Sequence, residues 1–278
     1  MRLREYSESI PKPMVKIGYR PILWHIMKYY AHFGHKDFIL CLGWKGDVIK
    51  EYFLNYDECM SNDFVLSSGG NEISLLNSDI QDWNITFVDT GTASNIGQRL
   101  KAVEPHLRNE EVFLANYTDG LTDLHLPDLI DFHREQKVIS ALLSVKPKYN
   151  SFHAVKVGGK GVVNEIEPVE KMDLWMNGGF FVFTPKIFEY MHDGEELVEQ
   201  PFERLIERQQ LCTVKHDGFW SCMDTFKEKE TLDDMYTKGD APWEVWKRSF
   251  NGFSRKKRAQ KSGRTNGARR RKYSEYSK

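Results

Sequence analysis

The sequence predicts an α/β protein with a Rossmann-like, mostly parallel mixed sheet that is flanked by helices. Short apolar runs alternate with amphipathic stretches through the first half of the chain, and this βαβα rhythm is typical of such a sheet. A length of 278 residues is enough to bury a core of that size. The second half is more irregular and holds several strand candidates close together.

The predicted elements follow in order from residue 21. Residues 21–33 carry apolar side chains at helical spacing and end at Gly34, which predicts a helix. Residues 37–42 form a short, continuously apolar run, as expected for a strand buried on both faces. By the same criteria we expect helices at residues 48–56, 97–103, 127–136 and 198–209, and strands at residues 85–88, 112–117, 138–145, 152–157, 161–166, 179–183 and 212–216.

Composition indicates an ordinary globular protein. Apolar residues make up 40% of the chain and charged residues 28%, as in most such proteins. No apolar run approaches the roughly 18–20 residues that span a bilayer, and the first residues lack a leader pattern. We therefore expect a cytoplasmic protein without membrane contacts. Its four cysteines lack metal-ligand spacing and are expected to be structural.

The C-terminal residues differ in character from the rest of the chain. Residues 255–278 carry eleven Lys or Arg and one Glu, although the net charge of the whole chain is −1. Such a segment cannot bury enough apolar surface to fold. The sequence thus predicts one domain over residues 1–248 and a disordered basic tail over residues 249–278. The tail could bind nucleic acid by counterion release, but no base-reading module accompanies it, so this role is not expected.

Two carboxylates lie where a ligand is expected. Asp119 directly follows the predicted strand at residues 112–117, and ligands of open α/β sheets bind beyond the carboxyl ends of the strands. Asp224 lies in the aromatic-rich segment G-F-W-S-C-M-D-T. Two hard oxygen ligands from distant segments suit Mg²⁺. On spacing alone, an Asp-Gly turn at Asp119 and a helix cap at Asp224 remain the more common explanations.

Three cations could handle phosphates. Arg2 and Lys12 lie ten residues apart around a turn bracketed by Pro11 and Pro13, and Arg99 lies in S-N-I-G-Q-R-L. A guanidinium group forks onto phosphate oxygens, and an ammonium group acts as a point charge. Singly, each is more often a solvated surface charge, so the three indicate phosphate binding only together.

The N-G-G sequence at Asn177, Gly178 and Gly179 has two explanations. Adjacent glycines allow a ligand to approach the backbone closely, whereas Asn-Gly is also the usual signal of a hairpin turn. The residues alone favour the turn. The histidines show no helical metal-binding pair, and no Ser-His-Asp order stands out.

Taken together, these segments resemble the sugar-nucleotide pyrophosphorylases, and most closely the glucose-1-phosphate cytidylyltransferase group. The resemblance runs from Arg2 to about Trp246 and is carried by R-L-R-E-Y-S, P-K-P-M-V-K-I-G, D-F-I-L-C-L-G-W-K-G, W-N-I-T-F-V-D-T-G, N-G-G-F-F-V-F and G-F-W-S-C-M-D-T. It implies transfer of a nucleotidyl group from a nucleoside triphosphate, here CTP, to a hexose 1-phosphate, here glucose 1-phosphate, with Mg²⁺ as cofactor. It also implies a homo-oligomer. The alternatives are another base or sugar phosphate, such as dTTP or UTP, or a non-catalytic sugar-nucleotide-binding relative.

The resemblance implies roles by position. Arg2 and Lys12 fall on the catalytic Arg and on the Lys of P-K-P, and Asp119 and Asp224 on two Mg²⁺-binding aspartates. Contacts to the nucleotide or the sugar phosphate are implied for Ser94, Arg99, Thr118, Asn177, Gly178 and Gly179.

The chain also departs from the family pattern. The first strand and its Gly-rich loop would precede Met1, so we expect in-frame codons for them upstream and poor folding of a polypeptide that begins at Met1. Thr118 replaces the usual Gly of G-D-G. The E-K-P motif appears as E-P-V-E-K at residues 167–171, so the lysine that contacts the sugar phosphate is displaced or lost.

Overall fold

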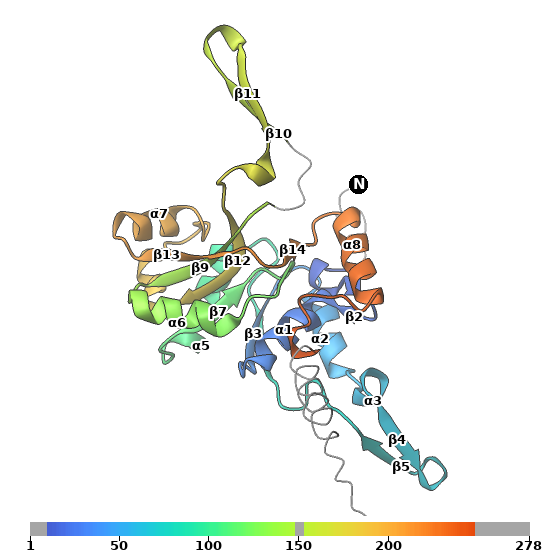
Figure 1. Ribbon diagram of the computed structural model, residues 1–278. Helices are drawn as coiled ribbons and strands as arrows, with labels where there is room; N and C mark the ends of the chain where they lie inside the picture. Colours follow the sequence, from blue (N-terminus) through green and yellow to red (C-terminus); the bar gives the residue numbers. More distant parts are fainter. Residues whose placement is uncertain (1–9, 148–152, 248–278) are drawn as a thin grey trace, which may run out of the picture.

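The structure, a computed structural model, describes residues 10–147 and 153–247 (Figure 1). Its helices are α1 (Ile22–His32), α2 (Gly46–Leu54), α3 (Glu58–Ser61), α4 (Ile96–Ala102), α5 (Glu104–Leu107), α6 (Leu126–Gln136), α7 (Gln200–Glu207) and α8 (Phe226–Thr237). Its strands are β1 (Lys16–Ile17), β2 (Arg20–Pro21), β3 (Asp37–Leu42), β4 (Phe64–Ser67), β5 (Glu72–Leu75), β6 (Asn84–Asp89), β7 (Phe113–Asn116), β8 (Gly120–Thr122), β9 (Ser140–Val145), β10 (His153–Val157), β11 (Val163–Pro168), β12 (Met176–Phe183), β13 (Leu211–His216) and β14 (Trp220–Cys222).

A four-stranded mixed sheet forms the centre, in the order β13-β9-β12-β7. Strands β13 and β9 are parallel, and β12 runs antiparallel to both of its neighbours. A second, parallel pair joins β3 to β6, and an antiparallel pair joins β14 to β8. The helices lie around these strands (Figure 1). The predicted mixed α/β fold is thus confirmed.

The core lies on both faces of β12, whose run F-F-V-F alternates between two apolar clusters. Phe180 and Val182 pack in one cluster with residues of α1 and α6. Phe181 and Phe183 pack in the other, together with Phe202 of α7. A third cluster joins α1 to β3 and α2. Helix α1 therefore connects the β3–β6 pair to the central sheet.

Strand β3 is less buried than the sequence predicted. Residues 37–42 do form a strand, but only Leu42 is buried, and Phe38, Ile39, Leu40 and Cys41 are half-buried. Within the described residues, β3 pairs with β6 alone. An open strand edge leaves neighbouring side chains partly in contact with water, which explains the lower burial. The expectation of a strand preceding residue 1 is not tested by these contacts and remains a prediction.

Two hairpins project from the body as arms (Figure 1). The two strands of the arm β10–β11 were predicted from the sequence, whereas those of β4–β5 were not. Both present apolar side chains to solvent. Phe64, Val65, Leu66, Ile73 and Leu75 on β4–β5 are 38–58% exposed, and Val155, Val157, Val163 and Ile166 on β10–β11 are 48–64% exposed.

Other expectations concern cysteines, membranes and the chain ends. The four cysteines are free and half-buried. Across residues 10–147 and 153–247, no helix has the length and apolar character to cross a membrane. Arg2 and the basic tail lie outside the described residues, so their roles and the domain boundary at residue 248 remain predictions.

Candidate active site

Lys12 connects the two aspartates that the sequence singled out. Its Nζ lies 2.7 Å from Oδ2 of Asp119 and 2.5 Å from Oδ1 of Asp224. Lys12 and Asp119 are partly exposed, and the Asp224 side chain is 61% exposed. The ammonium group therefore lies between two carboxylates on a face that solvent and ligands can reach.

Backbone pairing brings the two aspartates together. Asp119 precedes β8, and its carbonyl oxygen accepts a hydrogen bond of 2.9 Å from the amide of Met223. Strands β8 and β14 pair with Cys222 opposite Gly120, so Asp224 follows two residues beyond the pairing. The site is built on strand ends, where ligands of α/β sheets bind.

Lys12 is held by a short helical turn. It begins the 3₁₀ helix Lys12–Met14, with Pro11 before it and Pro13 within it. The amide of Met14 donates to the carbonyl of Pro11 at 2.8 Å, and Met14 is buried. Proline restricts φ, so the turn presents the lysine with little backbone freedom.

The simpler explanations for the aspartates are only partly right. Thr118 and Asp119 do form a turn, yet the Asp119 carboxylate also binds Lys12. The helix-cap explanation for Asp224 is wrong, because Thr225 is the N-cap of α8. Its hydroxyl accepts from the amide of Glu228, whose carboxylate accepts from the amides of Thr225 and Asp224. The Asp224 side chain is thereby left to face Lys12.

Ion pairing controls the protonation of the site. Burial lowers the pKa of Lys12, but the Asp119 and Asp224 carboxylates outweigh this effect and raise it above its usual value. Burial acts to raise the pKa of Asp224, and the hydrogen bond and charge of Lys12 lower it overall. All these shifts favour the charged forms near neutral pH.

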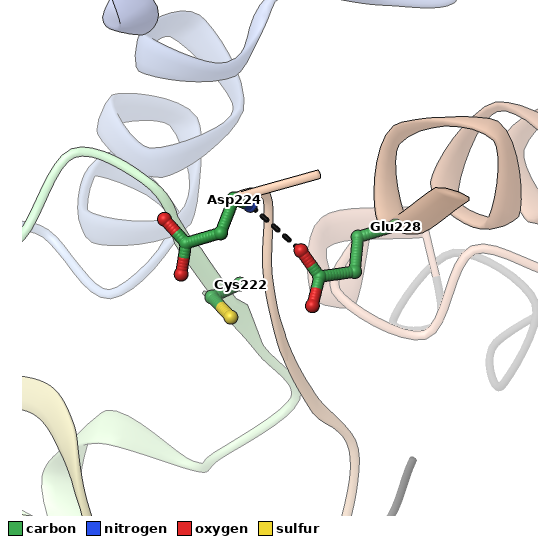
Figure 2. A group of neighbouring side chains, drawn as sticks. All are labelled: Cys222, Asp224 and Glu228. Carbon is green, nitrogen blue, oxygen red and sulfur yellow. Dashed lines mark hydrogen bonds between the residues drawn. The ribbon is translucent and has the colours of Figure 1, made fainter. Parts of the chain in front are cut away.

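Cys222, Asp224 and Glu228 form a small cluster that the sequence did not reveal in full (Figure 2). Their possible ligand atoms lie within 4.8 Å of one another. Burial, followed by the nearby Glu228 and Asp224 charges, raises the pKa of the Cys222 thiol to about 12. A protonated thiol is a poor ligand for a hard cation. The T-x-x-E capping pattern was a sequence signal for Glu228, whereas no signal pointed to Cys222.

Arg99 and Ser94 gather at the carboxyl ends of β3 and β6. Arg99 Nη1 donates to the Thr90 hydroxyl at 2.9 Å, and the Ser94 hydroxyl donates to the Thr90 carbonyl at 2.5 Å. A Cβ atom on Gly43 would lie 2.4 Å from Arg99 Nη1, so the missing side chain makes room for the guanidinium group. These two predicted residues thus both bind Thr90, while Lys12 pairs with the aspartates.

The prediction of a hairpin turn at the N-G-G segment is wrong. Asn177, Gly178 and Gly179 lie inside β12 at an irregularity in its pairing with β9, and do not form a hairpin turn. Gly179 has φ +74°, and a Cβ atom there would lie 2.7 Å from the ring of Tyr117. The extra backbone length of such a bulge re-aims side chains.

Trp220 ties this segment to the aspartate site. Its Nε1 donates to the carbonyl of Gly178 at 2.8 Å, and it belongs to β14, which leads to Asp224. On the other side, the Asn177 amide donates weakly to the Tyr117 hydroxyl at 3.5 Å. Tyr117 is followed by Thr118, which is exposed. The structure therefore places Thr118 and the N-G-G segment next to the strands that carry Asp119 and Asp224.

The fold is that of a class of proteins, the sugar nucleotidyltransferases. A UDP-glucose pyrophosphorylase structure aligns with a TM-score of 0.62 at 15% identity, covering 84% of this chain and 93% of that one. The structure of HddC from Yersinia pseudotuberculosis aligns with a TM-score of 0.56 at 18% identity, covering 85% and 94%. Both likenesses concern the fold. No protein-family model matches the chain.

Sequence similarity narrows the class. The glucose-1-phosphate cytidylyltransferases of Salmonella typhimurium and Salmonella typhi are each 40% identical to this chain over 247 residues, which cover 88% of this chain and 95% of theirs. The chain belongs to the glucose-1-phosphate cytidylyltransferase family, and the predicted resemblance is confirmed.

Proposed function

We propose that this protein transfers the cytidylyl group of CTP to glucose 1-phosphate, which gives CDP-glucose and pyrophosphate. A phosphate oxygen of the sugar phosphate attacks the α-phosphorus of CTP and forms the new P–O bond. The bond from that phosphorus to the bridging oxygen breaks, and its electron pair leaves with pyrophosphate. The observation that carries the proposal is the Lys12 ammonium group between Asp119 and Asp224.

The chain's own residues supply position and charge. Such a reaction needs no protein nucleophile, because positioning and charge stabilisation account for most of the catalysis. Lys12 would neutralise phosphate oxygens on the triphosphate. Arg99 and Ser94 would hold nucleotide or sugar phosphate at the ends of β3 and β6, and Asn177 would meet the sugar beside β12. A similar phosphate role for Arg2 rests on the family resemblance alone.

The residues present also fit the expected Mg²⁺. Asp119 and Asp224 offer hard oxygen atoms from two segments and are close enough to share one cationic group, and Mg²⁺ is usually held by one or two carboxylates and substrate phosphates. When bound, the ion would neutralise charge on the triphosphate. Cys222 would remain a neighbour and not a ligand, because its thiol is soft and protonated.

A pyrophosphate-release assay tests the function. Purified protein is incubated with Mg²⁺, glucose 1-phosphate and, in turn, CTP, dTTP or UTP. We expect release with CTP to exceed release with the other two. A faster reaction with dTTP or UTP would show that the protein prefers that nucleotide to CTP. Binding of CDP-glucose without pyrophosphate release from any triphosphate would favour the non-catalytic alternative.

We further propose that copies of this chain associate through the two arms. The exposed apolar side chains of β4–β5 and β10–β11 exceed the scattered apolar residues of an ordinary surface and are typical of protein contacts. Light scattering during gel filtration would measure the molar mass of the oligomer. Polar substitutions at Leu66 and Ile73, or at Val155 and Ile166, are expected to reduce it. An oligomer whose mass neither pair changes would refute the role of the arms. The cytoplasmic location and the lack of nucleic-acid partners remain predictions.

A further inference from the structure

Two lysines converge on one tryptophan at the edge of the central sheet. Lys146 Nζ lies 5.1 Å and Lys215 Nζ 4.8 Å from the ring centroid of Trp175. Lys146 follows β9, Lys215 belongs to β13, and Trp175 precedes β12. The indole N–H donates to the Asp173 carboxylate at 2.9 Å, which fixes the ring. Three chain segments thus build one cationic group, here named the lysine pair.

Strand register places the lysine pair beside the N-G-G segment. Ser144 of β9 lies opposite Asn177 on one side and opposite Lys215 on the other. Residues paired across neighbouring strands point to the same face of a sheet. Asn177 and Lys215 therefore flank Ser144 on one face. That face lies at the carboxyl ends of β9 and β13, where ligands of α/β sheets bind.

The charges of the lysine pair are incompletely balanced. The nearest carboxylate to Lys146 is that of Asp217, 4.0 Å away and 75% exposed, and such a long surface contact contributes little. For Lys215 the described residues provide no ion pair at all. Cation–π contact with Trp175 offsets part of the repulsion between two neighbouring ammonium groups. An anion held between the two ammonium groups would offset the remaining repulsion.

We propose that Lys146 and Lys215 bind the phosphate group of the sugar 1-phosphate. Lysine is a suitable point-charge ligand for phosphate. The neighbouring Asn177 would then contact the sugar. The proposal rests on the proposed function for the identity of the ligand. It would also explain how the chain manages without a lysine in the second position of its E-P-V-E-K segment, where Pro168 stands.

Calorimetric titration of the double variant Lys146→Gln/Lys215→Gln tests the lysine pair. Glucose 1-phosphate, glucose, inorganic phosphate and CTP are titrated separately into the wild type and the variant. We expect the variant to bind glucose 1-phosphate about ten to a hundred times more weakly, which corresponds to a loss of about 1.4–2.7 kcal/mol for the two contacts together. Affinity for CTP is expected to stay within about twofold, because the pair does not bind the triphosphate. The double Lys→Arg variant should restore most of the binding.

Lys156→Gln is the matched control. Lys156 is an exposed lysine of the β10–β11 arm, 2.7 Å from Glu165, and its loss should leave every affinity unchanged. Wild-type affinity for glucose 1-phosphate in the double variant would overturn the proposal, and so would a loss confined to CTP. If the pair binds glucose 1-phosphate but no triphosphate yields pyrophosphate, the proposed function fails while the phosphate site holds. If turnover occurs and the double variant binds glucose 1-phosphate like wild type, the proposed function holds while the phosphate site fails.

Discussion

Lys12 and Asp119 form an ion pair in which Nζ and Oδ2 are 2.7 Å apart, although the two residues lie in segments far apart in the sequence. Asp224 joins the same ammonium group from a third segment. The three side chains form a compact site because β8 and β14 pair next to the turn that carries Lys12.

Replacing Lys12 by Ala should lower turnover sharply without unfolding the protein. Removal of one positioned charge from such a site costs on the order of a hundredfold or more in kcat. The ion pairs are partly exposed, so their loss should change stability by about 1 kcal/mol or less. Steady-state pyrophosphate release and thermal unfolding measure the two effects. An unchanged rate would remove Lys12 from the mechanism, and Lys12→Arg should keep part of the activity.

Removing the charge of Lys12 should also strengthen metal binding in the absence of substrates. Lys12 competes for the carboxylates of Asp119 and Asp224, so its removal leaves them free for a divalent cation. We expect Lys12→Met to bind Mn²⁺ several-fold more tightly than wild type, an estimate from the loss of one competing charge. Free Mn²⁺ is measured by electron paramagnetic resonance. Asp224→Asn should bind more weakly, and equal affinities in all three proteins would argue against a shared metal site.

Buried His25 should make the protein less stable in acid. Its Nδ1 accepts from Trp243 Nε1 at 3.3 Å, so Nε2 donates to the carbonyl of Ile17 at 3.1 Å. Burial lowers the pKa of His25 from 6.5 to about 4. Its contribution to stability is complete above pH 6.5 and is lost as the pH falls toward 4, because only the unfolded chain then takes up the proton. The full loss is about 3 kcal/mol.

Urea unfolding at pH 7.5 and pH 4.5 measures this effect. His25→Gln retains one acceptor and one donor but does not titrate, so the free energy of unfolding of that variant should depend less on pH. Other histidines, including His133 with its lowered pKa, contribute equally to both proteins. Parallel pH profiles for wild type and variant would show that His25 is not the cause.

Gly179→Ala should distort the N-G-G segment. The position has φ +74°, and the added Cβ would lie 2.7 Å from the ring of Tyr117. Gly161→Ala is a matched control, since φ there is +78° but nothing lies within 4 Å of the added atom. The control should lose about 1 kcal/mol from backbone strain alone. Gly179→Ala should lose more and should also raise the KM for glucose 1-phosphate. Equal losses of stability in thermal unfolding, with unchanged KM, would contradict the close-contact argument.

Local sequence patterns predicted the core helices and strands well, but their burial less well. The helix at residues 21–33 and the strand at residues 37–42 are present as α1 and β3, because the spacing of apolar side chains is a local property. The burial of β3 was overestimated, because burial depends on which strand lies along each edge. The β4–β5 arm was missed because no local core pattern marks a hairpin that is exposed on both faces.

The sequence by itself determined the strands of the central sheet and of the β3–β6 pair, the family, and the residue types available for phosphate chemistry. These depend on local spacing and on motifs that keep their order along the chain. Only the tertiary structure decided that Lys12 meets Asp119 and Asp224, that Thr225 and not Asp224 caps α8, and that N-G-G is a bulge within β12. It also brought Lys146 and Lys215 to one indole. Each of these depends on strand register and packing between distant segments, and no local pattern contains that information.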